Sequence, residues 1–157
     1  DTELQDTLFE GELTNKASLL NDVLEPQFQR ALEAFSTEGW SLVCEHLENA
    51  PEASATEHVR SGQKTPSAEA GKNLKRSFEG FNMEFEASIR LWKSLVVPDP
   101  ELRKLMIARV EQRVVPAYRT FYDKFSRVQF SKRHMDTYVR ITPASATEMI
   151  GEILSGS

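Results

Sequence analysis

The sequence has few of the residues that hold a fold together covalently or through a metal ion. Its 157 residues include one cysteine and three histidines. The single thiol, Cys44, excludes an internal disulfide, and this usage fits a reducing, cytosolic setting. No apolar run approaches the roughly 20 residues of a membrane span, and no signal-peptide pattern is present. The chain begins at Asp1 without an initiator methionine, so we expect it to be a piece of a longer protein.

Catalytic and metal-binding patterns are also missing. The sequence has no HExxH, CxxC, GxSxG or glycine-rich phosphate loop. His46 and Cys44 are two residues apart, which places them on different sides of a helix, and we expect Cys44 to be a small buried apolar residue. No acidic residue falls in an apolar stripe, where burial would raise its pKa for acid–base chemistry. We therefore expect no enzyme activity, no metal site and no cofactor.

Charge is distributed unevenly along the chain, although the net charge is only −5. Residues 1–58 contain thirteen acids and two bases, and residues 59–157 contain eleven acids and seventeen bases. Two interpretations stay open: the two halves attract each other within the fold, or the basic half meets an anionic partner. The sequence pI of about 5.3 and the lack of any known nucleic-acid-binding motif argue against a dedicated nucleic-acid binder.

Hydrophobic periodicity predicts two long amphipathic helices, over residues 72–95 and 98–125. Asp99 is a good N-cap for the second helix, and Pro100 suits its first position. Pro116 lies inside the pattern, where we expect a kink rather than an end. The link between the helices is so short that they must lie antiparallel as a hairpin. The stripes expected in the core are Leu74, Phe78, Phe81, Phe85, Ile89, Trp92 and Leu95, then Leu102, Leu105, Met106, Val110, Val114, Tyr118, Phe121 and Phe125.

Shorter stripes predict helices on either side of this hairpin. We expect a break with a new helix cap at Ser36 and Thr37, and another cap at Thr142-Pro143 before a last short helix. The tail from Ser155 is expected to fray. The apolar residues that predict the earlier helices are Leu4, Leu8 and Phe9, then Leu20, Leu24, Phe28, Leu32 and Phe35, then Trp40, Val43, Cys44 and Leu47.

Residues 50–71 differ from their surroundings because they contain no aromatic residue and only one valine. Such a segment buries too little apolar area to offset its ordering entropy, so we interpret it as a long mobile loop. A loop of this length is unusual in a compact domain, so it is either an insertion or hides a short helix. The remaining chain has four or five one-sided helices and no convincing sheet. The sequence therefore predicts an all-α fold, an antiparallel helical bundle forming a single domain with its core at about residues 19–154.

The connector between Phe125 and Thr142 carries the candidate functional residues. Its bases are Arg127, Lys132, Arg133 and Arg140. A loop at the end of a rigid bundle is a common place for binding residues, and these would attract lipid phosphates. Nearby Phe130 and Met135 could enter the headgroup region of a membrane. Around Tyr138 and Arg140, the sequence favours an extended segment. The alternative is an ordinary solvated basic surface.

Three motifs resemble the C-terminal part of the seventy-kilodalton subunit of the exocyst: VVPDPELR (96–103), VVPAYRTFYDKF (114–125) and TYVRITP (137–143). The Phe81-Asn82 pair is similar to one in the preceding helix of that family. The family ends with a Lys, then Tyr, an aliphatic residue and Lys or Arg. Here Arg140 fills the last basic position, but Thr137 replaces the earlier Lys, and we expect Lys132 and Arg133 to supply the missing charge.

This resemblance implies the last bundle of a rod of stacked helical bundles. It implies a non-catalytic, cytoplasmic protein, peripheral at the plasma membrane, that helps to tether secretory vesicles in exocytosis. The implied partners are other exocyst subunits, phosphatidylinositol bisphosphate and a Rho-family GTPase, with no nucleic acid. The lipid-binding residues would be Arg127, Lys132, Arg133 and Arg140. The alternative is a protein-interaction scaffold whose basic face docks an acidic subunit without touching lipid.

Overall fold

The computed structural model describes residues 26–28, 30–50, 58–60 and 63–155. The chain divides into two compact units, residues 1–35 and 36–157. In the first unit, residues 26–28 and 30–35 are helical, and Leu32 is buried. Phe28 and Phe35 are 42% and 49% exposed, so these two members of the predicted apolar stripe are not buried. Helical spacing shows which residues share a face, but not whether another element covers that face. Leu4, Leu8, Phe9, Leu20 and Leu24 lie outside the described residues.

In the second unit, the first helical break falls later than predicted. Residues 36–39 are helical, the helix is interrupted at Trp40, and α2 follows (Ser41–Glu48). Ser36 is buried within the helical residues, so the predicted break at Ser36 and Thr37 is wrong. Serine can cap a helix or lie inside one, and the sequence does not separate these roles.

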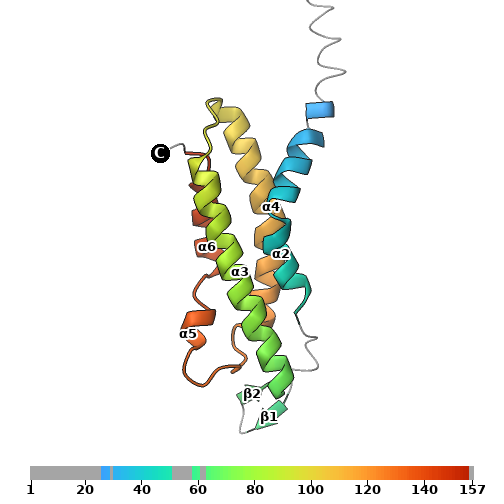
Figure 1. Ribbon diagram of the computed structural model, residues 1–157, viewed down its shortest axis with the longest axis vertical. Coiled ribbons are helices and arrows are strands. Elements are labelled where there is room, and N and C mark those ends of the chain that lie inside the picture. Colours follow the sequence, from blue (N-terminus) through green and yellow to red (C-terminus); the bar gives the residue numbers. More distant parts are fainter. Residues whose placement is uncertain (1–25, 29, 51–57, 61–62, 156–157) are drawn as a thin grey trace, which may run out of the picture. The chain divides into compact units, whose positions relative to one another are not determined.

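Two glycines, Gly39 just before α2 and Gly80 within α3 (Ala68–Ser94), mark where the α2 region approaches α3 closely. A Cβ atom at Gly39 would lie 2.7 Å from the indole ring of Trp92, and one at Gly80 would overlap the imidazole ring of His46. In both contacts, a glycine of one helical segment packs against an aromatic ring of the other segment. As the chain advances from Gly39 to His46, the partner position on α3 moves back from Trp92 to Gly80, so α2 runs antiparallel to α3 (Figure 1).

The predicted loop at residues 50–71 is partly ordered into secondary structure. A small antiparallel hairpin joins β1 (His58–Arg60) to β2 (Gln63–Thr65). The helix predicted from residue 72 instead begins at Ala68, because the Ser67 side chain caps it by accepting a hydrogen bond from Ala70 N. The prediction of a loop to residue 71 is therefore wrong at its end, where alanine and glutamate favour helix despite their low hydrophobicity.

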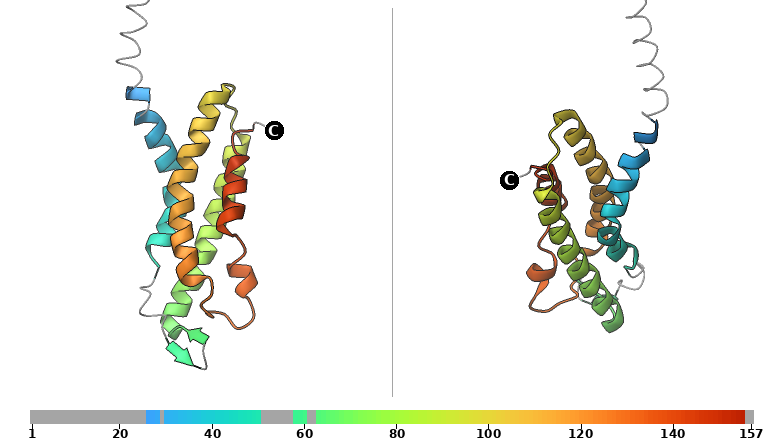
Figure 2. Two further views of the ribbon diagram at one scale, coloured as in Figure 1. Left: turned by 180° about the vertical axis from the view of Figure 1, so that it is seen from behind. Right: turned by 45° about the horizontal axis from the view of Figure 1, so that its top comes forward.

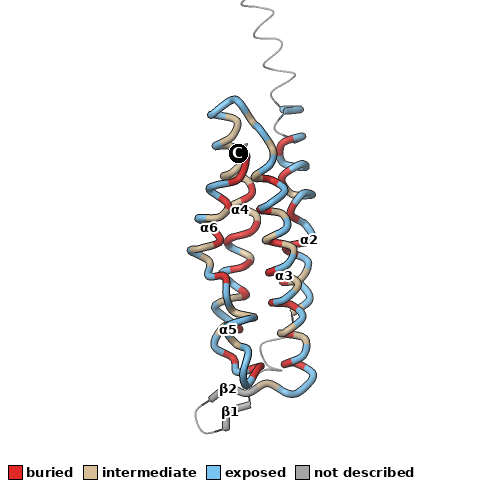
Figure 3. The backbone as a smooth tube through the Cα atoms, turned by 60° about the vertical axis from the view of Figure 1, so that its left-hand side comes forward, coloured by how far each residue is buried: buried red, intermediate tan, exposed pale blue. Residues whose placement is uncertain are grey.

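The predicted helical hairpin is confirmed, with α3 followed by α4 (Pro100–Phe125) in the opposite direction (Figures 1 and 2). Asp99 caps α4 by accepting from Glu101 N at 3.0 Å, and α4 continues through Pro116. The predicted stripes are confirmed as core, apart from half-buried Leu95, Leu102 and Leu105. Buried positions alternate with exposed ones along the whole length of the helices (Figure 3).

Aromatic rings fill the space between α3 and α4. Phe81 stacks on Tyr118 with ring centroids 3.9 Å apart, and Phe78 lies 4.7 Å from Phe121. The two long helices thus face each other through rings rather than through close backbones, which explains why large side chains fill both stripes.

The C-terminal segment packs along the hairpin, with α6 (Pro143–Gly151) beside α4 (Figure 2). Thr142 and Ser145 form a reciprocal capping box, which confirms the predicted cap. Leu154 N donates to the Trp92 carbonyl at 2.8 Å, and Ser155 pairs with Val96 in an antiparallel bridge. The prediction of fraying from Ser155 is therefore wrong at that residue. No helix among the described residues is both long enough and apolar enough to cross a bilayer.

Candidate functional site

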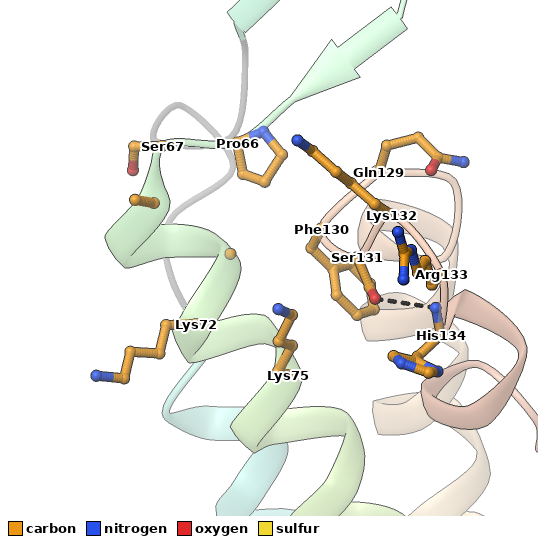
Figure 4. A pocket seen from close by; sticks show the side chains of 12 residues that line it. Pro66, Ser67, Lys72, Lys75, Gln129, Phe130, Ser131, Lys132, Arg133 and His134 are labelled. Atoms are coloured by element: carbon orange, nitrogen blue, oxygen red, sulfur yellow. Dashed lines mark hydrogen bonds between the residues drawn. The ribbon is translucent and has the colours of Figure 1, made fainter.

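A basic groove lies where the start of α3 meets the connector after α4. Its cavity volume is about 780 Å³. One wall comes from the entry to α3 and the other from residues 129–134 of the connector (Figure 4). The twelve lining residues are Pro66, Ser67, Ala68, Gly71, Lys72, Lys75, Gln129, Phe130, Ser131, Lys132, Arg133 and His134.

The connector wall is held in place by a buried ring. Phe130 is only 6% exposed and stacks on Phe78 of α3, with centroids 5.2 Å apart. The prediction that Phe130 enters a lipid headgroup region is therefore wrong, because this ring belongs to the core. Ser131 is also buried, and its hydroxyl accepts a hydrogen bond from His134 N at 3.1 Å. This contact closes a turn that leaves the side chains of Lys132 and Arg133 exposed.

Cations approach the groove from both walls. Lys132 extends across it toward Pro66, Lys75 rises from α3 into the space between the two walls, and Lys72 points away from the connector (Figure 4). None of the lining residues is acidic. Within the described parts of the chain, no carboxylate forms an ion pair with Lys75, Lys132 or Arg133. Like charges that share a groove without a counter-charge repel each other, so an anion bound between them would be stabilised.

The structure does not gather all four bases predicted from the sequence. Lys132 and Arg133 share the groove, but Arg127 lies in a separate hollow beside Tyr122 and Asp123. Arg140 forms an ion pair with Glu86 of α3, with 2.8 Å between Nη1 and Oε1.

Arg140 also lines a smaller cavity, of about 230 Å³, between α3 and the connector. The extended segment predicted around Tyr138 is wrong in part, since α5 (Met135–Tyr138) is a helical turn and the backbone leaves helical geometry only after it. Met135 is half-buried, on the same short turn.

Sequence reasoning misses the two lysines on α3. The linear pattern places Lys72 and Lys75 at a loop edge and on the polar side of a helix, and nothing in it links them to residues 129–134. Their three-residue spacing puts them near each other on the helix, which is the one available signal. The rest depends on which helix end meets which loop, and that is a tertiary property.

Titratable groups in the core favour packing over catalysis. Burial raises the pKa of the Cys44 thiol, although the nearby Arg113 partly opposes this and Glu48 adds to it. Burial likewise raises the pKa of Tyr118, whose hydroxyl donates to the Ile141 carbonyl. Both groups are therefore neutral near pH 7. The described residues contain no cluster of three or more His, Cys, Asp or Glu side chains that could hold a metal ion.

Comparison with known proteins gives a consistent result. The family model for the C-terminal part of the Exo70 exocyst complex subunit matches residues 14–152. The exocyst complex component EXO70A1 of Arabidopsis thaliana is 31% identical over 83 residues, which cover 53% of this chain and 13% of that protein. Exocyst complex component 7 of Drosophila melanogaster is 30% identical over 84 residues, or 54% of this chain and 12% of that protein.

A longer match is to the exocyst complex protein EXO70 of Yarrowia lipolytica, with 27% identity over 130 residues, 83% of this chain and 20% of that protein. The chain thus spans a fifth or less of these relatives. No solved structure matches it. The family model covers most of the chain, including both long helices and the connector. The protein therefore belongs to the Exo70 exocyst family, and it matches the C-terminal region of that family.

Proposed function

We propose that this chain is the C-terminal helical bundle of a non-catalytic exocyst subunit, which helps to tether secretory vesicles to the plasma membrane. In this proposal the basic groove binds the phosphates of an anionic phosphoinositide. Other exocyst subunits and a Rho-family GTPase are the protein partners, and the protein is cytoplasmic and peripheral at the membrane. Family membership supports the exocyst role, and the groove supports the lipid contact.

The observation that carries the lipid contact is the uncompensated charge in the groove. Lys75 comes from one wall and Lys132 and Arg133 from the other, and no acid lines the space between them. A phosphate group placed there would receive charged hydrogen bonds from two separate elements. The proposal therefore refines the predicted site: Lys132 and Arg133 keep their role, and Lys75 joins them with Lys72 at the edge. Arg127 contributes only general attraction from its own hollow.

The number of cations in the groove sets the expected loss of vesicle affinity. Each Lys or Arg near an anionic membrane contributes about 1 kcal/mol. Removal of three groove cations should then weaken vesicle binding by roughly a hundredfold, because 1.4 kcal/mol corresponds to a factor of ten in affinity. The loss should shrink as the salt concentration rises, since screening weakens the attraction.

Vesicle flotation tests this proposal with a charge-matched control. The test variant carries Lys75→Ala, Lys132→Ala and Arg133→Ala. The control carries Arg90→Ala, Arg119→Ala and Lys124→Ala, which remove the same charge from exposed positions outside the groove. With vesicles that contain phosphatidylinositol bisphosphate, only the test variant should lose binding.

Equal losses in both variants would show that net charge alone drives binding and would remove the groove from the proposal. The scaffold function would be favoured if the wild-type protein does not bind these vesicles but binds acidic exocyst subunits through the same three residues.

A further inference from the structure

Three side chains of α3, spaced four residues apart, each contact one residue of the connector. Phe78 stacks on Phe130, at 5.2 Å between centroids. One turn later, Asn82 Nδ2 donates to the Tyr138 carbonyl at 2.8 Å. After another turn, Glu86 forms the 2.8 Å ion pair with Arg140. Residues four apart on a helix lie along one face, so these contacts form a single seam beside the connector.

In the second half of the seam, the contacts that α3 makes with the connector are polar. The cavity of about 230 Å³ separates α3 from the connector there, and Met83 and Thr137 line it without filling it. Asn82 is only 2% exposed, so its bond to the Tyr138 carbonyl is shielded from water. From the other side, the Tyr118 hydroxyl of α4 donates to the Ile141 carbonyl.

These contacts fix the connector at both ends of an exposed stretch. Phe130 is anchored before it, and residues 138–141 are anchored after it. Lys132 and Arg133 lie between these anchors and are exposed. A released end would gain conformational entropy, and this would let the turn leave the groove.

We infer that Glu86 and Arg140 are positioning residues, which hold the connector so that Lys132 and Arg133 face Lys75. This inference rests on the proposed function of the groove and deepens it. Arg140 then acts through its carboxylate partner and does not itself meet the phosphate. Its place beside the smaller cavity, rather than in the basic groove, agrees with this role.

The sign of one substitution separates this inference from its rivals. If Arg140 were a direct ligand restrained by Glu86, then Glu86→Ala would free it and tighten anion binding. If only the local charge mattered, the loss of an acid would also tighten binding. Only the positioning role predicts weaker binding. We expect an affinity only about threefold lower, since the ion pair is partly exposed and water screens it.

The matched control is Glu79→Ala, which removes an equal charge from the same helix. Glu79 also lines the smaller cavity, but no ion pair to it is found among the described residues. This variant should bind phosphatidylinositol bisphosphate vesicles as tightly as wild type or slightly more tightly. Both variants should unfold at the same temperature as wild type within a few degrees.

Amide hydrogen exchange without lipid supplies a readout that does not depend on binding. Exchange in residues 134–142 should accelerate in Glu86→Ala and stay unchanged in Glu79→Ala. Tighter vesicle binding by Glu86→Ala, or unchanged exchange in that segment, would overturn the inference. If wild type does not bind the vesicles at all, the proposed function fails, and the exchange data alone decide whether the ion pair holds the connector.

Discussion

Replacement of Phe130 by alanine tests whether this ring is a structural anchor or a membrane contact. The ring is 6% exposed, stacks on Phe78 and meets Tyr138 edge-on with centroids 5.7 Å apart. Truncation of a buried Phe to Ala costs about 3–5 kcal/mol of unfolding free energy. Because the groove opens beside this ring, the site can relax or admit water, so we expect a cost near the lower end, about 3 kcal/mol.

Urea unfolding followed by tryptophan fluorescence measures this loss. Trp40 and Trp92 are both buried and lie 5.7 Å apart, so their emission reports the opening of the core. Phe130→Leu supplies the comparison, since leucine keeps most of the apolar volume and should cost about 1.5 kcal/mol. Vesicle binding should follow the fraction of folded protein in both variants.

The opposite pattern would refute the anchor. A ring that enters the membrane would leave the urea midpoint nearly unchanged on truncation to alanine and would lower vesicle affinity directly. A change in unfolding free energy below about 0.5 kcal/mol, which is typical of surface substitutions, would therefore contradict the burial of this ring.

Two further predictions concern the helix contact and the buried thiol. Gly80→Ala should destabilise the protein by about 1–3 kcal/mol in urea unfolding, because the new methyl group meets His46. The control Gly151→Ala has open space around it and should be neutral or stabilising by up to about 1 kcal/mol. Equal effects of the two substitutions would contradict the close approach of Gly80 to His46. Burial raises the pKa of Cys44, so the folded state keeps this proton longer than the unfolded state does. Its contribution to stability is complete below about pH 8.5 and falls as the pH rises further, and urea midpoints from pH 7 to 10 should decline less steeply in Cys44→Ala. Identical slopes would count against the raised pKa.

The sequence predicts the long helices well because their signals are local and repeated. The stripe from Leu74 to Trp92 reports a single buried face over several turns, and the Asp99-Pro100 start is a cap that needs no distant partner. The start of α3 is missed because alanine, serine and glutamate suit a polar loop as well as a helix end. Phe130 is misplaced because a single ring in a connector carries no periodicity.

The candidate site is predicted only in part, for the same physical reason. The basic run containing Lys132 and Arg133 is visible in the linear sequence, but Lys75 joins it only because Phe130 brings the connector against α3. Charge alone groups Arg140 with them. Its pairing with Glu86, more than fifty residues earlier in the chain, depends on the packing of the C-terminal segment and has no local signal.

The reciprocal contacts of Gly39 with Trp92 and of Gly80 with His46 have a consequence for sequence variation. Each glycine and its ring occupy a shared volume, so their sizes are coupled. A relative that carries a larger residue at either glycine position should carry a smaller one at the partner position, or should separate the two helices. The pairs 39–92 and 46–80 are therefore expected to covary in volume, and this covariation would reveal the register of α2 on α3 from sequences alone.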